Sequence, residues 1–194
     1  MTRENKKLGS IVSLSPKKQL AFALLVYERM QPILVSFSKD TGFDDSCYLQ
    51  AKDAAWAALQ NGPVAQSLSE ACLRGAPDTE EYSHELTSYA LNAALAMNDI
   101  VEFTQDGSAD HITSVSALAG DSIDLYLSSL EDSVMSSLEE DSQIASHSLM
   151  EEEHRREEED IRFLVGLPEQ LSDETIQSLR ARADTQDPLL PFTV

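Results

Sequence analysis

The chain has 194 residues, of which 42% are hydrophobic and 25% are charged. This length is enough for a domain with a sizeable core, and the apolar fraction is too high for a disordered chain. The 34 acidic and 14 basic residues give a net charge of −20. That charge argues against nucleic acid and against an anionic membrane as partners, because both repel a negative surface. A basic protein remains open as a partner, as does a second copy of the chain.

Seven glycines, seven prolines and many alanines predict an all-α fold, because helix breakers are few and good helix formers are common. We expect a single helical domain over residues 1–194, a compact bundle of six or seven helices around a central N-terminal helix kinked by proline. Residues 1–14 are expected to form a loose arm, and residues 185–194, which contain two prolines, an irregular tail. No internal repeat and no strand pattern is found in the sequence.

The central helix is predicted to begin at Pro16, after an N-cap at Ser15, because proline needs no N–H at the first helical position. Its apolar residues lie on two faces, which indicates a helix largely surrounded by protein. Pro32 should kink or restart this helix, because it removes the hydrogen bond to the carbonyl of Glu28 at a cost of about 3 kcal/mol. Gly42 suits the left-handed conformation that ends a helix.

The other helices are predicted from apolar residues that recur at steps of three and four. Asp78, with Glu81 three residues later, resembles a capping box and places the start of one long helix near residue 79. Ser172 is the expected N-cap of the last helix. The predicted segments are residues 47–60, 64–74, 79–104, 110–139 and 143–166, and the helix after Ser172.

Location and cysteine chemistry are constrained only weakly. The longest apolar run, residues 20–27, is far too short to span a bilayer, and no signal peptide is found, so a cytoplasmic protein is expected. Cys47 and Cys72 form no metal-ligand spacing and are expected to be buried free thiols.

A family resemblance is carried by residues 27–43. They contain "ERM", Pro32, Phe37 and "TGF", which together give E-R-M-x-P, then F, then T-G-F. This arrangement resembles the YjaG-like family, small bacterial proteins classed as a domain of unknown function. Weaker similarity continues through an alanine-rich helix, "DHITSVSALAG" and an acidic helix that ends in "IRFLVGL". The resemblance implies a compact all-helical domain and no catalytic residues, while "GLPEQLSDE" departs from it, since more continuous last helices are expected.

Two charged residues next to the proline are candidates for a polar cluster at the kink. Glu28 and Arg29 lie beside Pro32 on a helix that is otherwise mostly apolar. One hypothesis is a polar pocket in which Glu28 acts as an acid or a ligand. The favoured interpretation is a buried structural ion pair that holds the kink against the helix predicted at 79–104.

A metal site is the second hypothesis, because two Glu-x-x-His pairs on helices of a bundle are typical of di-iron carboxylate proteins. The residues are Glu81, His84, Glu151 and His154, with Glu28 and Glu131 available to complete the set. Against this, His154 lies within ten consecutive polar residues, 151–160, which favours a solvated helix face with weak surface pairs. His111, at a helix start, is expected to be neutral and exposed. We therefore assign no metal, no cofactor and no catalytic residue.

The preferred function is a non-enzymatic protein-interaction domain. One alternative is a metalloenzyme with carboxylate ligands in a helical bundle. A further alternative is an acidic mimic of nucleic acid that binds a basic protein.

Overall fold

The computed structural model describes residues 3–134 and 139–192, with side chains placed for residues 7–130 and 148–192. Within those ranges the chain forms eight α-helices and no β-strand, so the predicted all-α class is confirmed. The helices are α1 (Arg3–Val12), α2 (Pro16–Thr41), α3 (Ser46–Ala58), α4 (Gln66–Arg74), α5 (Thr87–Asp106), α6 (Ala109–Val134), α7 (Glu139–Val165) and α8 (Asp173–Asp184).

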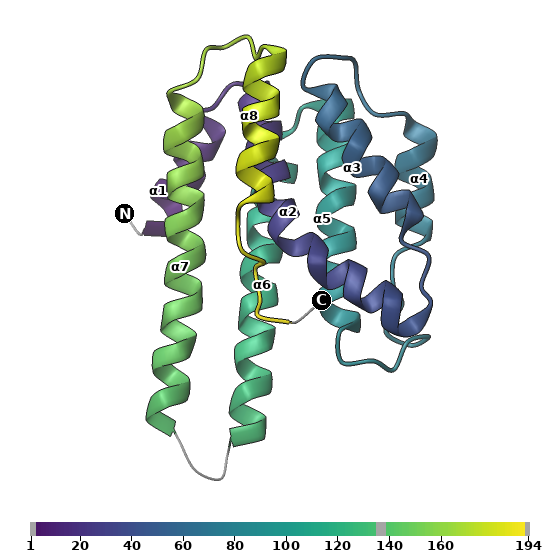
Figure 1. Ribbon diagram of the computed structural model, residues 1–194, viewed down its shortest axis with the longest axis vertical. Coiled ribbons are helices and arrows are strands. Elements are labelled where there is room, and N and C mark those ends of the chain that lie inside the picture. The colour runs from purple at the N-terminus through teal and green to yellow at the C-terminus, as the bar shows by residue number, and fades with distance from the viewer. Residues whose placement is uncertain (1–2, 135–138, 193–194) are drawn as a thin grey trace.

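The helices form two groups that share α2 (Figure 1). The long antiparallel helices α6 and α7 stand on one side, and α3, α4 and α5 stand on the other. The helix α2 crosses between them and contacts α5, α6, α7, α8 and α3. This arrangement places α2 at the centre of the domain.

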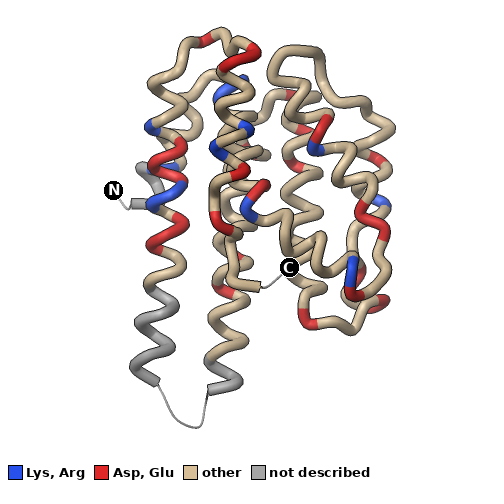
Figure 2. The backbone as a smooth tube through the Cα atoms, viewed as in Figure 1, with Lys and Arg blue, Asp and Glu red and all other residues tan. Residues whose placement is uncertain are grey.

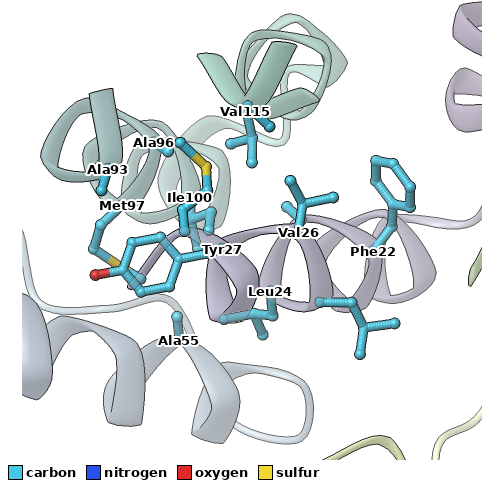
Figure 3. Packing of buried hydrophobic residues seen from close by; sticks show 14 of the residues in the cluster. Phe22, Leu24, Val26, Tyr27, Ala55, Ala93, Ala96, Met97, Ile100 and Val115 are labelled. Atoms are coloured by element: carbon cyan, nitrogen blue, oxygen red, sulfur yellow. The ribbon is translucent and has the colours of Figure 1, made fainter. Parts of the chain in front are cut away.

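The apolar content of α2 explains that position. It is the one helix of the described residues that is long and apolar enough to cross a membrane, yet 83% of its most apolar stretch is buried inside the domain. Burial of these side chains is the main favourable term for folding. Figure 3 shows the core around it, with Phe22, Leu24, Val26 and Tyr27 of α2 near Ala55, Ala93, Ala96, Met97, Ile100 and Val115 of its neighbours.

Pro32 lies inside α2 without breaking it. The predicted restart does not occur, and the helix is continuous from Pro16 to Thr41, although its direction changes along its length (Figure 1). The Arg29 carbonyl, one turn before the proline, accepts a hydrogen bond of 2.8 Å from the backbone N–H of Leu189. The irregular C-terminal tail is thus docked against the turn that the proline disturbs.

The N-terminal segment is not a loose arm over the described residues. Residues 3–12 form α1, which contacts α6 and α7, and Ile11 and Leu14 are buried. The mixed polarity of this segment does not indicate a loose arm. A short helix that packs on the surface of a core needs apolar residues on only one of its faces.

The long helix predicted from residue 79 starts later, at Thr87. Asp78 caps a local turn instead, because its Oδ1 accepts the N–H of Glu80 at 2.8 Å. Tyr82 then packs edge-on against Phe37 and Phe43, with ring centroids 5.3 and 5.9 Å apart. An aspartate such as Asp78 can begin either a turn or a helix. Here the packing of Tyr82 against the two phenylalanines favours the turn.

Candidate functional site: a buried carboxylate–arginine network

The acidic stretch 151–160 lies in α7, where Figure 2 shows red acidic segments interrupted by blue basic ones. Burial divides these charges between an inner and an outer face of the helix. Glu153, Glu157 and Asp160 are only 3%, 1% and 0% exposed. Spacings of four and three residues place them on one side of a helix. The prediction of a solvated face is therefore wrong for this side of α7, which points three carboxylates into the protein.

Arg29 of α2 meets two of these carboxylates. Its Nη2 donates to Glu153 Oε1 at 2.6 Å, and its Nε donates to both Glu153 oxygens at 3.1 Å. Its Nη1 donates to Asp160 Oδ2 at 2.8 Å and to Gln186 Oε1 at 2.7 Å. The guanidinium is completely buried, and the fork-shaped contacts satisfy its donors within the protein.

Asp160 carries the network to the last helix. Its Oδ1 accepts from Arg182 Nε at 2.8 Å and from Gln186 Nε2 at 3.1 Å. Four elements, α2, α7, α8 and the tail, are joined in this way. The expectation that Arg29 pairs with the helix at 79–104 is wrong, because its partners lie on α7 and in the tail.

Burial and pairing act in opposite directions on these charges. Burial lowers the pKa of Arg29, but Glu153 and Asp160 outweigh it and hold that pKa above its ordinary value. Burial raises the pKa of Glu153, and Arg29 offsets only part of that rise. The arginine stays charged, so the carboxylates around it are the counter-ions that a buried guanidinium needs.

Glu157, on the same buried side of α7, has its own partners on α1 and α6. Lys7 Nζ lies 2.6 Å from its Oε2, and Ser116 Oγ donates to its Oε1 at 2.5 Å. His154 Nδ1 is 4.0 Å from the same carboxylate. Since Lys7 belongs to α1, this buried pair fixes the N-terminal helix to α6 and α7.

The outer face of α7 is solvated as predicted. Arg155 bonds Glu152 at 2.6 Å and Glu159 at 2.5 Å, and Arg156 donates to Glu152 at 3.1 Å. The bond from Arg155 is the main cause that lowers the pKa of Glu152 to about 2. Glu153 takes no part in these outer pairs, because it turns inward to Arg29.

Glu28 is not part of the Arg29 network. It accepts from Trp56 Nε1 at 2.9 Å and from Lys52 Nζ at 3.1 Å, both on α3. Glu28, Arg29 and Pro32 are neighbours in sequence, but the two charges tie α2 to different helices.

The four metal-ligand candidates are not brought together. Glu81 is exposed in a turn, and His84, in the loop before α5, lies 3.9 Å from Asp40. Glu151 is exposed and His154 half-buried on α7. Within the described residues, no group of three or more His, Cys, Asp and Glu side chains could hold a metal ion. The side chain of Glu131 lies outside the described residues.

Two hollows flank the buried carboxylates. One, of about 340 Å³, is bounded by Glu153, Arg156 and the tail from Asp187 to Phe192. The other, of about 320 Å³, is bounded by Lys7, Ser116 and His154. Glu153, which lines the first hollow, is engaged by Arg29, and Lys7, which lines the second, is engaged by Glu157, so the buried charges support structural cohesion better than acid–base chemistry.

The sequence contained a signal for the buried carboxylates. Residues 153, 157 and 160 continue, at a step of four, to the fully buried Leu164. Charge alone suggested exposure, but the spacing is that of a buried stripe. An arginine or lysine on another helix is the partner that such a stripe requires.

Comparisons with known proteins agree with this architecture. The profile of DUF416, described as a protein of unknown function, matches residues 7–188. The fold is similar to the crystal structure of a DUF416 family protein from Shewanella baltica OS155, with a TM-score of 0.82 and 18% identity. That similarity covers 96% of this chain and 98% of the other. A search of curated proteins found no significant match. The chain belongs to the DUF416 family of proteins of unknown function.

Proposed function

We propose that this protein is a non-enzymatic interaction domain that binds a basic segment of a partner protein. The surface that we assign to the partner is an acidic patch where the end of α2, the start of α3 and the loop 75–86 meet. In Figure 2 several red segments lie at this end of the molecule. The patch consists of the exposed residues Asp40, Asp44, Asp78, Glu80, Glu81 and Glu85.

The observation that carries the proposal is that the loop of this patch is held in place. Tyr82 packs against Phe37 and Phe43, while Thr87 Oγ1 donates to the Tyr82 and His84 carbonyls at 3.0 and 2.8 Å. The carboxylates on either side of Tyr82 therefore project from a fixed backbone. A preorganised surface loses less conformational entropy when a partner binds.

The distribution of positive charge strengthens the acidity of the surface. Lys7, Lys18, Arg29 and Lys52 are all turned toward internal acceptors. Because these positive charges lie against internal acceptors, they offset less of the negative charge of the exposed carboxylates. A field of one sign steers a partner of the opposite sign and sets the rate of encounter.

Charge-neutralised variants test this proposal with a short lysine- and arginine-rich peptide as the probe. The patch variant carries Asp40→Asn, Glu80→Gln, Glu81→Gln and Glu85→Gln. The control variant has the same change of net charge at other exposed positions, with Asp121→Asn, Asp124→Asn, Glu174→Gln and Asp184→Asn.

We expect the parent to bind the peptide with an affinity that falls as salt increases, and the patch variant to bind roughly tenfold more weakly or worse. The control should stay close to the parent. Equal losses in both variants would mean that net charge alone attracts the peptide, and the assignment of the patch would be wrong.

Two further assignments are proposals of the same kind. Within DUF416, the E-R-M-x-P word at residues 28–32, with Phe37 and "TGF" after it, supports the YjaG-like assignment. A cytoplasmic location is supported by the two cysteines, both of which are free thiols in the structure.

A further inference from the structure

The two cysteines of the chain lie on the contacting helices α3 and α4, although 24 residues separate them in sequence. Cys47 lies in the first turn of α3 and Cys72 near the end of α4, and the two thiol groups are close enough to affect each other's pKa. Cys47 is half-buried, whereas Cys72 is only 1% exposed.

Two other contacts fix the helices at this level. The hydroxyl of Tyr48, the residue after Cys47, donates to the backbone carbonyl of Cys72 at 2.7 Å in a buried bond. A Cβ placed on Gly75 would lie 3.9 Å from both the Cys47 sulfur and the Cys72 carbonyl oxygen. The Cys47 sulfur therefore lies over the last turn of α4, beside the residue that carries the second thiol.

We propose that Cys47 and Cys72 are an oxidation site, at which a peroxide converts the two thiols into an intramolecular disulfide between α3 and α4. This inference is independent of the acidic patch. It needs no large rearrangement, because the Cys47 sulfur lies at the last turn of α4 and the Tyr48 hydroxyl ties α3 to the carbonyl of Cys72.

The reaction balances with a peroxide as the oxidant. The sulfur of Cys47, which solvent reaches, attacks one oxygen of hydrogen peroxide, the O–O bond breaks, and the sulfenic acid of Cys47 and one water form. The sulfur of Cys72 then attacks the Cys47 sulfur, the S–O bond breaks, and a second water leaves with the proton of the Cys72 thiol. Two thiols are oxidised and one peroxide is reduced to two waters.

The surroundings of the thiols make this reaction slow. Burial raises the pKa of Cys47, and burial raises the pKa of Cys72 to about 12. The thiolate is the reactive form, so both groups are mostly unreactive at neutral pH. The site suits sustained oxidation better than rapid signalling.

The cross-link closes the chain between residues 47 and 72, which restricts the unfolded state. For a domain of this size we expect the melting temperature to rise by roughly 5 to 10 °C. The rise should disappear when dithiothreitol reduces the bond.

Mass spectrometry after hydrogen peroxide treatment tests the pairing. Trypsin cleaves after Lys39, Lys52 and Arg74, so the cysteines fall in separate peptides, 40–52 and 53–74. We expect these two peptides to be linked without reduction, and the intact chain to lose about 2 Da, the mass of two hydrogens. A link between two copies of the chain, or sulfinic acid at Cys47 with Cys72 still a thiol, would overturn the proposal.

Matched variants separate the cross-link from other oxidation. Cys47→Ala and Cys72→Ala each remove one sulfur and keep a small apolar side chain at that position. Neither variant should show the peptide link or the peroxide-dependent rise in melting temperature. If either variant shows the same rise as the parent, methionine or other oxidation causes it and the proposal is wrong.

Discussion

The guanidinium of Arg29 holds the Glu153 carboxylate through both Nε and Nη2, at 3.1 and 2.6 Å, and joins α2 to α7 across 124 residues of chain. Asp160, two turns further along the same face of α7, is held by the same arginine at 2.8 Å. A helix that looks strongly hydrophilic in sequence is therefore attached to the central, largely buried helix by buried charge. Replacing either side of such a contact leaves the other charge without a counter-ion.

We expect Arg29→Met to destabilise the protein by about 3–5 kcal/mol, because Glu153 and Asp160 would be left buried and uncompensated. Urea unfolding monitored by circular dichroism measures this change. Arg155→Met is the matched control, since Arg155 pairs with exposed glutamates on the same helix, and about 1 kcal/mol or less is expected there. A similar loss of unfolding free energy in both variants would show that the buried contact stabilises the protein no more than a surface ion pair.

Lys7→Met should release α1 from the domain. The ammonium of Lys7 bonds Glu157 and Ser116, and these contacts join α1 to α7 and α6. Without it, Glu157 is a buried carboxylate with a hydroxyl and a distant imidazole as its neighbours, so the local structure should open more often. Amide hydrogen exchange should speed up through residues 3–12 more than through α5.

Lys17→Met is the control for this experiment, because Lys17 is exposed at the start of α2. It should leave exchange in α1 unchanged. If α1 is equally protected in Lys7→Met and in the parent, apolar contacts such as that of Ile11 hold the helix without the ion pair.

How far the sequence predicts this structure depends on the range of the interaction. The ends of α2 follow from Pro16 and from Gly42, which has φ of 76°, because both act on their own backbone. The helix start predicted near residue 79 is wrong, because an aspartate such as Asp78 can begin a turn as well as a helix. The sequence predicts Glu153 to face solvent because its partner lies far along the chain, and no pattern within α7 identifies Arg29. Local chemistry was predictable, while partners across the fold were not.

His111 also differs from its expected exposed and neutral state, and this gives a pH-dependent prediction. It is half-buried, with Nδ1 2.9 Å from Asp99 and Nε2 3.2 Å from Asp106. Partial burial lowers the pKa of His111, but the two carboxylates outweigh this and hold it above 6.5. The folded state binds the proton more tightly than the unfolded state, so the stabilisation is complete below pH 6.5 and is lost as the pH rises through the folded pKa.

The free energy of unfolding of the parent should therefore contain a component that decreases from pH 6.5 upward. In His111→Gln this component should be absent, because glutamine can donate a hydrogen bond but does not titrate. Urea unfolding at several pH values measures both proteins. A difference between them that does not change across this range would mean that His111 has the same proton affinity when folded and unfolded.

Pro32→Ala tests whether the bend of α2 is needed. Alanine favours a helix interior by about 3 kcal/mol over proline, so local propensity alone predicts a more stable variant. We expect the opposite, because a straighter helix would move the Arg29 carbonyl away from the Leu189 N–H, 2.8 Å from it, and would shift the guanidinium from Glu153. The melting temperature should fall, and exchange of the Leu189 amide should become faster.

Pro16→Ala, at the first position of the same helix, should change neither. A Pro32→Ala protein that melts above the parent and keeps the Leu189 amide protected would show that the packing does not depend on the proline.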